Sequence, residues 1–375
     1  MKIPIAKPYL TAEEAQSAYD TILSGWLTQG TKVATFEQLF AKYVGSAYAV
    51  ATSSGTTALH LAMIVAGLGI GDEVICPSLS YIATANAIRY TGAKVVFAEV
   101  NQSYNLDIND VKNKITEKTK AILLVHQMGM PADLEAFMDL CKTKNLTLIE
   151  DAACAVGSAY FEAKIGSHSD LVCFSFHPRK VITTGEGGMI STSNKAFYER
   201  LLLLRQHGMT INDRVRHLSE KVMITDHQEL GYNYRMTDIQ AAIGIKQLEK
   251  LDWIVSERRK IAQYYHESLK NLNCLVLPSE QRGYFSNYQS YSIYLKENSP
   301  ISSQNLMQEL LNVGIATRSG IMTSHRETAY QEYSQVTLPL SEDLSDNSVL
   351  LPLYVPMEEQ EINFVVRHLR HWLCC

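Results

Sequence analysis

Lys180 occupies a place where a strand of a parallel sheet would present a side chain to a ligand. The apolar run 171–176 ends just before it, His177 comes between, and a glycine-rich turn follows from Thr183 to Gly188. Open α/β sheets bind ligands outside the carboxyl ends of their strands. A lysine at such a point can form a Schiff base with an aldehyde. The alternative is an ordinary surface lysine on a loop, because most lysines are exposed.

A second candidate site is the segment Ser53-Ser54-Gly55-Thr56-Thr57, which lies between an apolar strand and a helix. The first N–H groups of a helix lack partners within it and carry the positive end of its dipole. With the hydroxyls of Thr56 and Thr57 they could bind a phosphate. The alternative is ordinary helix capping by serine or threonine. The chain has no GxxxxGK[ST] motif, which argues against a nucleoside triphosphatase.

Two further segments place polar groups at the ends of predicted elements. Asp151 follows the apolar strand 146–149, where a carboxylate is costly unless it is paired. A cationic ligand nitrogen would pair it, and the alternatives are a helix cap or an internal salt bridge. Asn233 and Arg235 lie in a polar loop before a long helix and could reach an anion or a neighbouring subunit. The alternative for both is a solvated loop.

Several other chemistries are disfavoured. His126 and His177 have no HxH or HExxH spacing, so no metal site is expected. Ser175 is not part of a GxSxG elbow, which argues against serine hydrolysis. The glycines of segment 67–71 follow a predicted helix instead of a strand, so they favour a helix end over a dinucleotide site.

Composition restricts the class of protein and its partners. The chain has 375 residues, 46% of them hydrophobic and 19% charged, with a formal net charge of −5. This balance predicts a globular protein without a nucleic acid or membrane partner. Its seven cysteines lack CxxC spacing, and the N-terminus does not resemble a signal peptide, so a cytoplasmic location is expected.

The predicted elements alternate between short apolar strands and helices, which indicates a parallel sheet covered by helices on both faces. The length and a change of pattern near residue 245 predict two domains, 1–245 and 246–375, the second a smaller α/β unit. The expected strands are 47–51, 73–76, 94–98, 121–125, 146–149, 171–176, 189–192 and 291–295. The expected helices are 12–24, 34–44, 56–66, 82–91, 132–143, 237–269, 303–313 and 358–372.

Taken in order, these segments resemble the sugar aminotransferases of the DegT/DnrJ/EryC1/StrS family, over essentially the whole chain. The matching segments are Ser24-Gly25-Trp26, Gly30, 54–59, Pro77-Ser78, 83–86, Val125-His126, Gly129, 150–153, 174–176, Lys180, 184–188, 231–235 and 351–353. The resemblance implies the aspartate aminotransferase-like fold, type I. That fold is a three-layer α/β domain with a mostly parallel central sheet, followed by a smaller C-terminal α/β domain. It also implies a pyridoxal 5'-phosphate cofactor.

The resemblance also implies a role for each candidate residue. Lys180 would hold the cofactor as a Schiff base and then act as the proton-transferring base. Asp151 would pair with the pyridine nitrogen and improve the ring as an electron sink. Tyr81 would stack on the ring. The phosphate would bind at Gly55, Thr56, Thr57 and Ser175, with Asn233 reaching it across the interface of a homodimer that shares its active sites.

One departure from the family pattern concerns the cofactor's 3-hydroxyl. The family commonly has glutamine or histidine where this chain has Cys154, and a thiol is a weak hydrogen-bond partner. A branch of the family replaces the lysine by histidine and dehydrates sugars. Lys180 is retained here, which favours transamination over the alternatives of a dehydratase or a non-catalytic pyridoxal-binding regulator.

The expected function is transfer of an amino group, by resemblance from L-glutamate, to a nucleotide-linked keto-sugar of the keto-deoxyhexose type. The product would be an amino sugar for a polysaccharide, glycoconjugate or glycosylated metabolite. The candidate substrate contacts are Trp26, Arg235, Arg318 and His325. The segment 205–230, which contains Arg205, His207, Arg214, Arg216 and His217, is a candidate substrate loop, with a solvated surface loop as the alternative.

Overall fold

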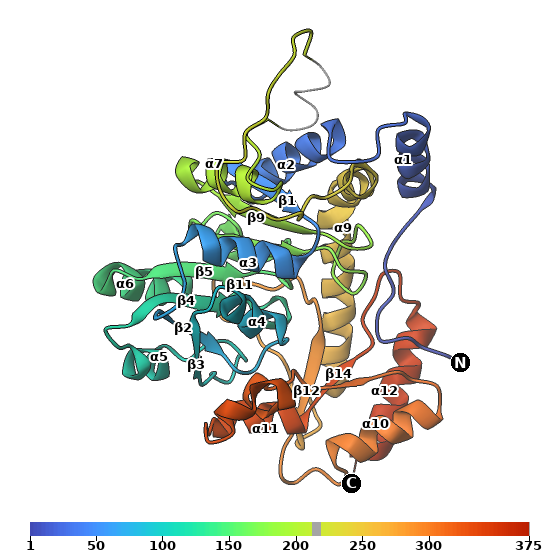
Figure 1. The fold of residues 1–375 in the computed structure, drawn as a ribbon. Coiled ribbons are helices and arrows are strands. Elements are labelled where there is room, and N and C mark those ends of the chain that lie inside the picture. The colour runs from blue at the N-terminus through green and yellow to red at the C-terminus, as the bar shows by residue number, and fades with distance from the viewer. Residues whose placement is uncertain (212–218, 375) are drawn as a thin grey trace.

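The computed structural model describes residues 1–211 and 219–374, and its largest element is a seven-stranded sheet (Figure 1). The strand order is β1-β9-β8-β5-β4-β2-β3, and among these strands only β9 runs against the others. The strands are β1 (Tyr48–Thr52), β2 (Glu73–Pro77), β3 (Lys94–Ala98), β4 (Thr119–Val125), β5 (Thr147–Asp151), β8 (Val172–Ser175) and β9 (Gly188–Thr192).

Both faces of this sheet are apolar and covered by helices. Along β1, Val50 belongs to one buried cluster and Ala49 and Ala51 to the other, because successive side chains of a strand point to opposite faces. The Val50 face is covered by α3 (Gly55–Val65), α4 (Ala83–Tyr90) and α7 (Lys195–Leu204). The opposite face is covered by α2 (Thr31–Val44), α5 (Ile108–Lys114), α6 (Leu134–Lys144) and α9 (Asp238–Leu269). The predicted three-layer arrangement with a mostly parallel sheet is therefore present.

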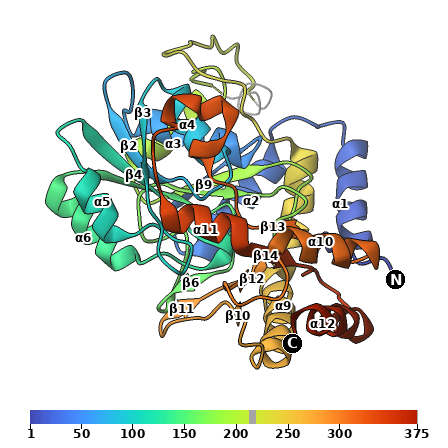
Figure 2. The same cartoon turned by 90° about the horizontal axis from the view of Figure 1, so that it is seen from below.

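A second, antiparallel sheet lies at the other end of α9 (Figures 1 and 2). It consists of β10 (Leu275–Val276), β12 (Tyr291–Leu295), β14 (Ser348–Leu351) and β13 (Arg318–Ser319), in that order. The helices α10 (Ser303–Asn312), α11 (Pro339–Asn347) and α12 (Glu359–Leu373) accompany it. A third small sheet joins β11 (Tyr284–Phe285), β6 (Ala159–Tyr160) and β7 (Ala163–Lys164).

The predicted boundary between residues 245 and 246 falls inside α9, which runs unbroken through 32 residues. The N-terminal strand segment also joins the second sheet region, because Ile3 bridges Ile315 and Ile5 accepts a hydrogen bond from the Leu353 N–H at 3.2 Å. No break in the structure therefore separates residue 245 from residue 246. The division into two domains stays a prediction. Short 3₁₀ helices at Gln127–Gly129, Ser324–Arg326 and Thr328–Tyr333, with α1 (Ala12–Leu23), complete the described elements.

The elements missed from the sequence are short ones. The structure adds α5, α7, α11 and β14, together with the two-residue strands β6, β7, β10, β11 and β13. A strand of two residues shows no alternation of polar and apolar positions, so no pattern identifies it. Among the described residues, no helix combines the length and the apolar character needed to cross a bilayer.

Candidate active site

The segment predicted to bind the phosphate lies where β1 ends and α3 begins. Ser54 caps α3, since its hydroxyl accepts from the Thr57 N–H at 3.1 Å while the Thr57 hydroxyl accepts from the Ser54 N–H at 3.0 Å. The capping alternative is thus realised for Thr57, whose N–H and hydroxyl are both used inside the chain. The N–H groups of Gly55 and Thr56 have no partner among the described residues, which leaves two donors for an anion.

Ser175, at the end of β8, lies against this helix start. A Cβ atom added to Gly55 would stand 2.7 Å from the Cβ of Ser175 and 3.3 Å from its Cα. Glycine at position 55 therefore lets the start of α3 approach the end of β8 and brings Ser175 next to the free N–H groups. The predicted grouping of Gly55, Thr56 and Ser175 is present in the structure.

Asp151 ends β5 and is 5% exposed. Its Oδ2 accepts from the Thr84 hydroxyl at 2.8 Å, and its Oδ1 accepts from the Ala153 N–H at 3.1 Å. The Ser80 hydroxyl lies 2.8 Å from that of Thr84 and continues the network. No cationic side chain among the described residues forms an ion pair with Asp151, although a buried carboxylate requires compensation. A ligand cation would supply the missing partner.

Lys180 points toward the segment that follows Asp151. Its Nζ donates to the Cys154 Sγ at 3.1 Å, and its N–H donates to the His177 carbonyl at 2.8 Å in a tight turn. Side chains of another segment hold the backbone on both sides of the Lys180–Cys154 contact. Asn287 donates to the Cys154 carbonyl at 2.9 Å, and Gln289 donates to the Arg179 carbonyl at 2.6 Å. The Lys180 amine therefore contacts Cys154, three residues after Asp151 at the end of β5.

Tyr81 and Asn233 both remain accessible to groups outside this chain. Tyr81 follows β2 and is 71% exposed, and its carbonyl accepts from the Thr84 N–H at 3.0 Å. The segment around Asn233 lies beside the segment predicted to bind the phosphate, because the Ser53 N–H donates to the Tyr234 carbonyl at 2.9 Å. Tyr232 and Tyr234 stack on each other at 4.9 Å and pack against α3.

Asn233 lies between those two tyrosines in sequence and is exposed. Arg235 follows Tyr234, is half-buried, and has no hydrogen bond or ion pair to a described residue. Because side chains alternate along an extended segment, Asn233 and Arg235 project away from the face on which the tyrosines pack. This orientation suits contacts to a substrate or to a second subunit.

The other candidate substrate contacts have different surroundings. His325 is 3% exposed, with Nδ1 2.6 Å from the Ser78 hydroxyl and Nε2 3.1 Å from Glu342 Oε1. Both ring nitrogens are therefore occupied, which leaves His325 no free donor or acceptor for a substrate. Trp26 is half-buried in the loop between α1 and α2, where its Nε1 donates to the Gln29 carbonyl at 3.4 Å.

Arg318, by contrast, is exposed on β13. Partial burial and then the nearby positive charge of Arg179 lower the pKa of the Arg318 guanidinium. Neither arginine forms a side-chain ion pair with a described carboxylate. Arg179 precedes Lys180 directly, so this cationic pair borders the site. Sequence reasoning did not select Arg179, because its neighbour on β13 is distant along the chain.

The candidate substrate loop 205–230 is only partly accounted for. Arg205 is 4% exposed, forms an ion pair with Glu37, and donates to the Ala51 carbonyl at 2.8 Å. The prediction that Arg205 belongs to a substrate loop or a solvated loop is wrong, because its buried side chain connects the end of α7 to α2 and β1. The His207 carbonyl lies 3.0 Å from the His227 Nδ1 at the base of the segment. Arg214, Arg216 and His217 lie outside the described residues.

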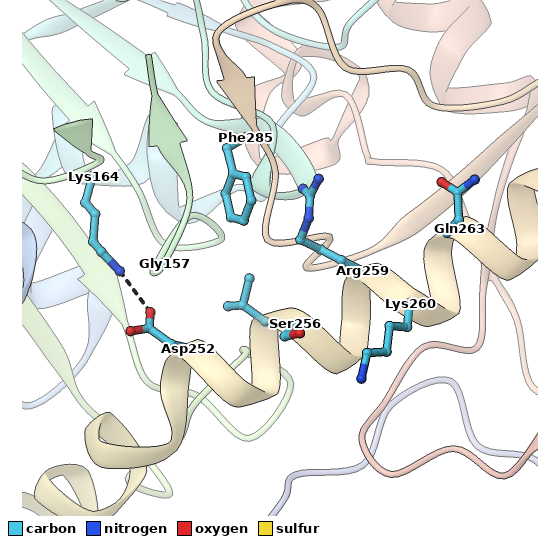
Figure 3. Close-up of a pocket in the computed structure, with 9 residues that line it drawn as sticks. Gly157, Lys164, Asp252, Ser256, Arg259, Lys260, Gln263 and Phe285 are labelled. Atoms are coloured by element: carbon cyan, nitrogen blue, oxygen red, sulfur yellow. Dashed lines mark hydrogen bonds and ion pairs between the residues drawn. The ribbon is translucent and has the colours of Figure 1, made fainter. Parts of the chain in front are cut away.

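Two surface cavities lie apart from this group of residues. One, of about 540 Å³, runs along α9 and is lined by Lys164, Asp252 and Arg259 among others (Figure 3). Its main charges are paired, since Lys164 Nζ lies 2.9 Å from Asp252 and Arg259 contacts Glu280 at 2.6 Å. A second cavity of about 300 Å³ lies between segments 101–104 and 276–294. Neither cavity is lined by a predicted site residue.

Pyridoxal phosphate fits the donors and acceptors that the structure leaves unpaired. Free N–H groups at Gly55 and Thr56 suit its phosphate, and the uncompensated Asp151 carboxylate suits its pyridine nitrogen. Lys180, whose Nζ contacts Cys154 three residues after Asp151, would supply the amine that holds the cofactor's aldehyde. Cys154 would lie at the cofactor as well, where its thiol is a weaker hydrogen-bond partner than an amide or imidazole.

Replacing Gly55 by alanine is expected to weaken pyridoxal phosphate binding at least about tenfold, equivalent to one hydrogen bond left unmade. The new Cβ would meet Ser175 at 2.7 Å and force the start of α3 away from it. Absorbance-monitored cofactor titration measures the change. Gly69→Ala is a matched control, since the nearest atom to its new Cβ is the Thr91 carbonyl oxygen at 3.9 Å. Equal affinity in the Gly55→Ala variant and the wild type would place the phosphate elsewhere.

Comparisons with known proteins agree with this arrangement. Residues 8–370 match the model of the DegT/DnrJ/EryC1/StrS aminotransferase family. The chain is 37% identical over 366 residues to the GDP-perosamine synthase of Escherichia coli O157:H7, covering 97% of this chain and 96% of that protein.

Two solved structures have the same fold. S. venezuelae DesV, solved in complex with a ketimine intermediate, superposes with a TM-score of 0.92 at 30% identity, covering 100% of this chain and 99% of that one. Spr1654 from Streptococcus pneumoniae, solved in its PMP form, superposes with a TM-score of 0.93 at 26% identity, covering 99% and 98%. The predicted aspartate aminotransferase-like fold and pyridoxal phosphate cofactor are confirmed. The chain belongs to the DegT/DnrJ/EryC1/StrS aminotransferase family, as a pyridoxal phosphate-dependent sugar aminotransferase.

Proposed function

We propose that this enzyme transfers an amino group from L-glutamate to a GDP-linked keto-sugar of the keto-deoxyhexose type, in amino-sugar biosynthesis. The observation that supports the proposal is the contact of Lys180 Nζ with Cys154, three residues after Asp151, together with the unpartnered N–H groups of Gly55 and Thr56. The nucleotide follows from the relatives, because GDP-perosamine synthases of Escherichia coli O157:H7 and Vibrio cholerae are 37% and 35% identical to this chain.

Lys180 and Asp151 would have different roles in such a reaction. Pyridoxal phosphate, held by Lys180, Asp151 and the N–H groups of Gly55 and Thr56, would supply the electron sink and the carrier for the amino group. Lys180 Nζ moves the proton that accompanies each transfer, from a position fixed by the Gln289 and His177 contacts. Asp151 provides negative charge at the pyridine nitrogen, held in orientation by Thr84 and Ala153.

We further propose a homodimer in which Asn233 of one chain completes the phosphate site of the other. Asn233 is exposed, and the segment before it carries apolar side chains that a monomer leaves in water, with Val222 98%, Ile224 89% and Leu230 86% exposed. Large exposed apolar groups favour a protein interface. The free cysteines among the described residues and a nucleotide-sugar substrate support a cytoplasmic location.

The shared site makes a complementation experiment possible. Lys180→Ala and Asn233→Ala variants are each expected to be strongly impaired alone. In a mixed dimer, one of the two sites would contain both intact residues, so activity is expected to return after mixing and subunit exchange. Mixed dimers separated by two affinity tags provide the measurement. Activity no higher than the sum of the parents would contradict a shared site, while the oligomeric state would be established separately by light scattering.

The donor and acceptor can be tested separately by absorbance. L-Glutamate is expected to shift the visible band of the bound cofactor to the near ultraviolet, and a GDP-linked keto-sugar is expected to restore it. UDP- and dTDP-linked keto-sugars are the comparison acceptors. A band that glutamate leaves unchanged would exclude this donor. Restoration by a UDP- or dTDP-sugar alone would exclude the GDP assignment and leave the aminotransferase intact.

Arg318 is a proposed contact for the substrate diphosphate, together with Arg179. Both guanidinium groups lie near each other without a described carboxylate partner, and guanidinium binds phosphate oxygens through two parallel hydrogen bonds. Arg318→Gln is expected to raise KM for the nucleotide sugar about tenfold with little change in kcat. Steady-state kinetics measure both constants, and Arg282→Gln, at another exposed arginine, is the control. A fall in kcat with KM unchanged would argue against substrate binding by Arg318.

A further inference from the structure

Cys154 and Lys180 form a contact between a thiol and an amine inside the cofactor site. Lys180 Nζ donates to Cys154 Sγ at 3.1 Å. The carbonyl of Cys154 accepts from Asn287 Nδ2 at 2.9 Å, and the carbonyl of Arg179, next to Lys180, accepts from Gln289 Nε2 at 2.6 Å. A single segment, 287–289, therefore holds both partners in place. The fold therefore fixes the backbone on both sides of the contact between Lys180 and Cys154.

The other cysteines of the described residues lack this environment. Cys76 in β2, Cys141 in α6 and Cys173 in β8 are buried, and burial raises the pKa of each thiol and keeps it protonated. Cys274 is also buried, and Cys374 is exposed near the C-terminus. Cys154 alone among them is partly buried with an amine as its neighbour. A small oxidant can therefore reach a thiol whose nearest nucleophile is the cofactor lysine.

We propose that Cys154 and Lys180 are a redox modification site, at which a hydroperoxide links the two side chains by a reversible sulfur–nitrogen bond. Hydrogen peroxide first transfers one oxygen to Cys154: the O–O bond breaks, the sulfur is oxidised by two electrons to the sulfenic acid, and water leaves. The neutral Lys180 amine then attacks the sulfur. The S–N bond forms, the S–O bond breaks, and the hydroxyl leaves as a second water with a proton from the amine.

The linkage would remove the amine on which the cofactor depends. It requires a free Lys180, so it is expected in the protein without cofactor and in the amino form of the enzyme, and not while Lys180 is bound to pyridoxal phosphate. Formation in the amino form rests on the proposed function, because that form is generated with L-glutamate. Formation in the cofactor-free protein does not, so failure of the donor assignment and failure of this proposal are distinguishable.

The test exposes the full-length protein to hydrogen peroxide in three states: cofactor-free, loaded with pyridoxal phosphate, and loaded and then treated with L-glutamate. Mass spectrometry of the intact chain and of its peptides is the readout. We expect a Cys154–Lys180 cross-link that is lighter than the two peptides by two hydrogen atoms, in the first and third states only. We also expect it to disappear with dithiothreitol. Cofactor uptake, followed by absorbance, is expected to be lost on oxidation and regained on reduction.

Cys154→Ser is the matched control, because it keeps a small polar side chain and removes the sulfur. It is expected to give no cross-link, and its cofactor uptake, whatever its starting value, is expected to be the same before and after peroxide. Lys180→Ala is expected to stop at the Cys154 sulfenic acid, which adds one oxygen atom. Oxidation of Cys154 in the wild type without linkage to Lys180 would overturn the proposal, as would loss of cofactor uptake on oxidation of Cys154→Ser. A linkage that forms equally in the loaded enzyme without donor would overturn the requirement for a free amine.

Discussion

Lys180→Ala is expected to lower the rate of amino transfer by at least about 10⁴-fold, the upper range for loss of a general acid–base group, because it also removes the group that binds the cofactor's aldehyde carbon. Among the described residues, the lysine amine that donates to Cys154 Sγ is that of Lys180, at 3.1 Å. The variant should still bind the cofactor's phosphate, because Gly55, Thr56 and Ser175 are unchanged. Single-turnover kinetics with L-glutamate measure the loss.

Lys164→Ala is the matched control for this experiment. Lys164 belongs to the surface cavity along α9, where it pairs with Asp252 at 2.9 Å, and it lies outside the catalytic group. An exposed ion pair contributes about 1 kcal/mol or less to stability, so this variant should fold and react like the wild type. If Lys180→Ala retained a rate within tenfold of the wild type, Lys180 could not be the proton-transferring residue.

Asp151→Asn is expected to lower kcat by about 10²- to 10³-fold, the range for loss of one preorganised electrostatic contact. Asparagine keeps the size of the side chain and can still accept from the Ala153 N–H, so the strand end should fold normally. What disappears is the negative charge opposite the cofactor's ring nitrogen. The amino acid half-reaction should slow more than cofactor binding weakens, which stopped-flow absorbance and cofactor titration resolve separately.

Thr84→Val separates the effect of the orientation of Asp151 from the effect of its charge. Thr84 donates to Asp151 Oδ2 at 2.8 Å, so valine removes the hydrogen bond and leaves the charge. A smaller loss than in Asp151→Asn, about tenfold, is expected for this positioning residue. Asp252→Asn, at an exposed carboxylate, is the control for the amide substitution. Equal losses in Thr84→Val and Asp151→Asn would mean that orientation matters more than charge.

Much of the site could be predicted from the sequence because its residues lie at the ends of recognisable strands. Apolar runs mark β5 and β8; Asp151 and Ser175 are the last residues of these strands, and Lys180 lies in the turn after β8. The parallel arrangement then brings those ends to one edge of the sheet. Gly55 and Thr56 could be located in the same way, since a strand, a serine cap and a helix start leave a local signal. The ordered resemblance to a family added the cofactor and the roles.

Other features became visible only in the tertiary structure, because they join segments that are far apart in the chain. Thr84 meets Asp151 across 67 positions, and Asn287 meets Cys154 across 133. The burial of His325 between Ser78 and Glu342, and of Arg205 against Glu37, likewise depends on packing that no local pattern reports. The sequence determines which side chains lie at the end of a strand. The tertiary structure determines which distant groups form hydrogen bonds with them, because most buried polar groups must be hydrogen-bonded.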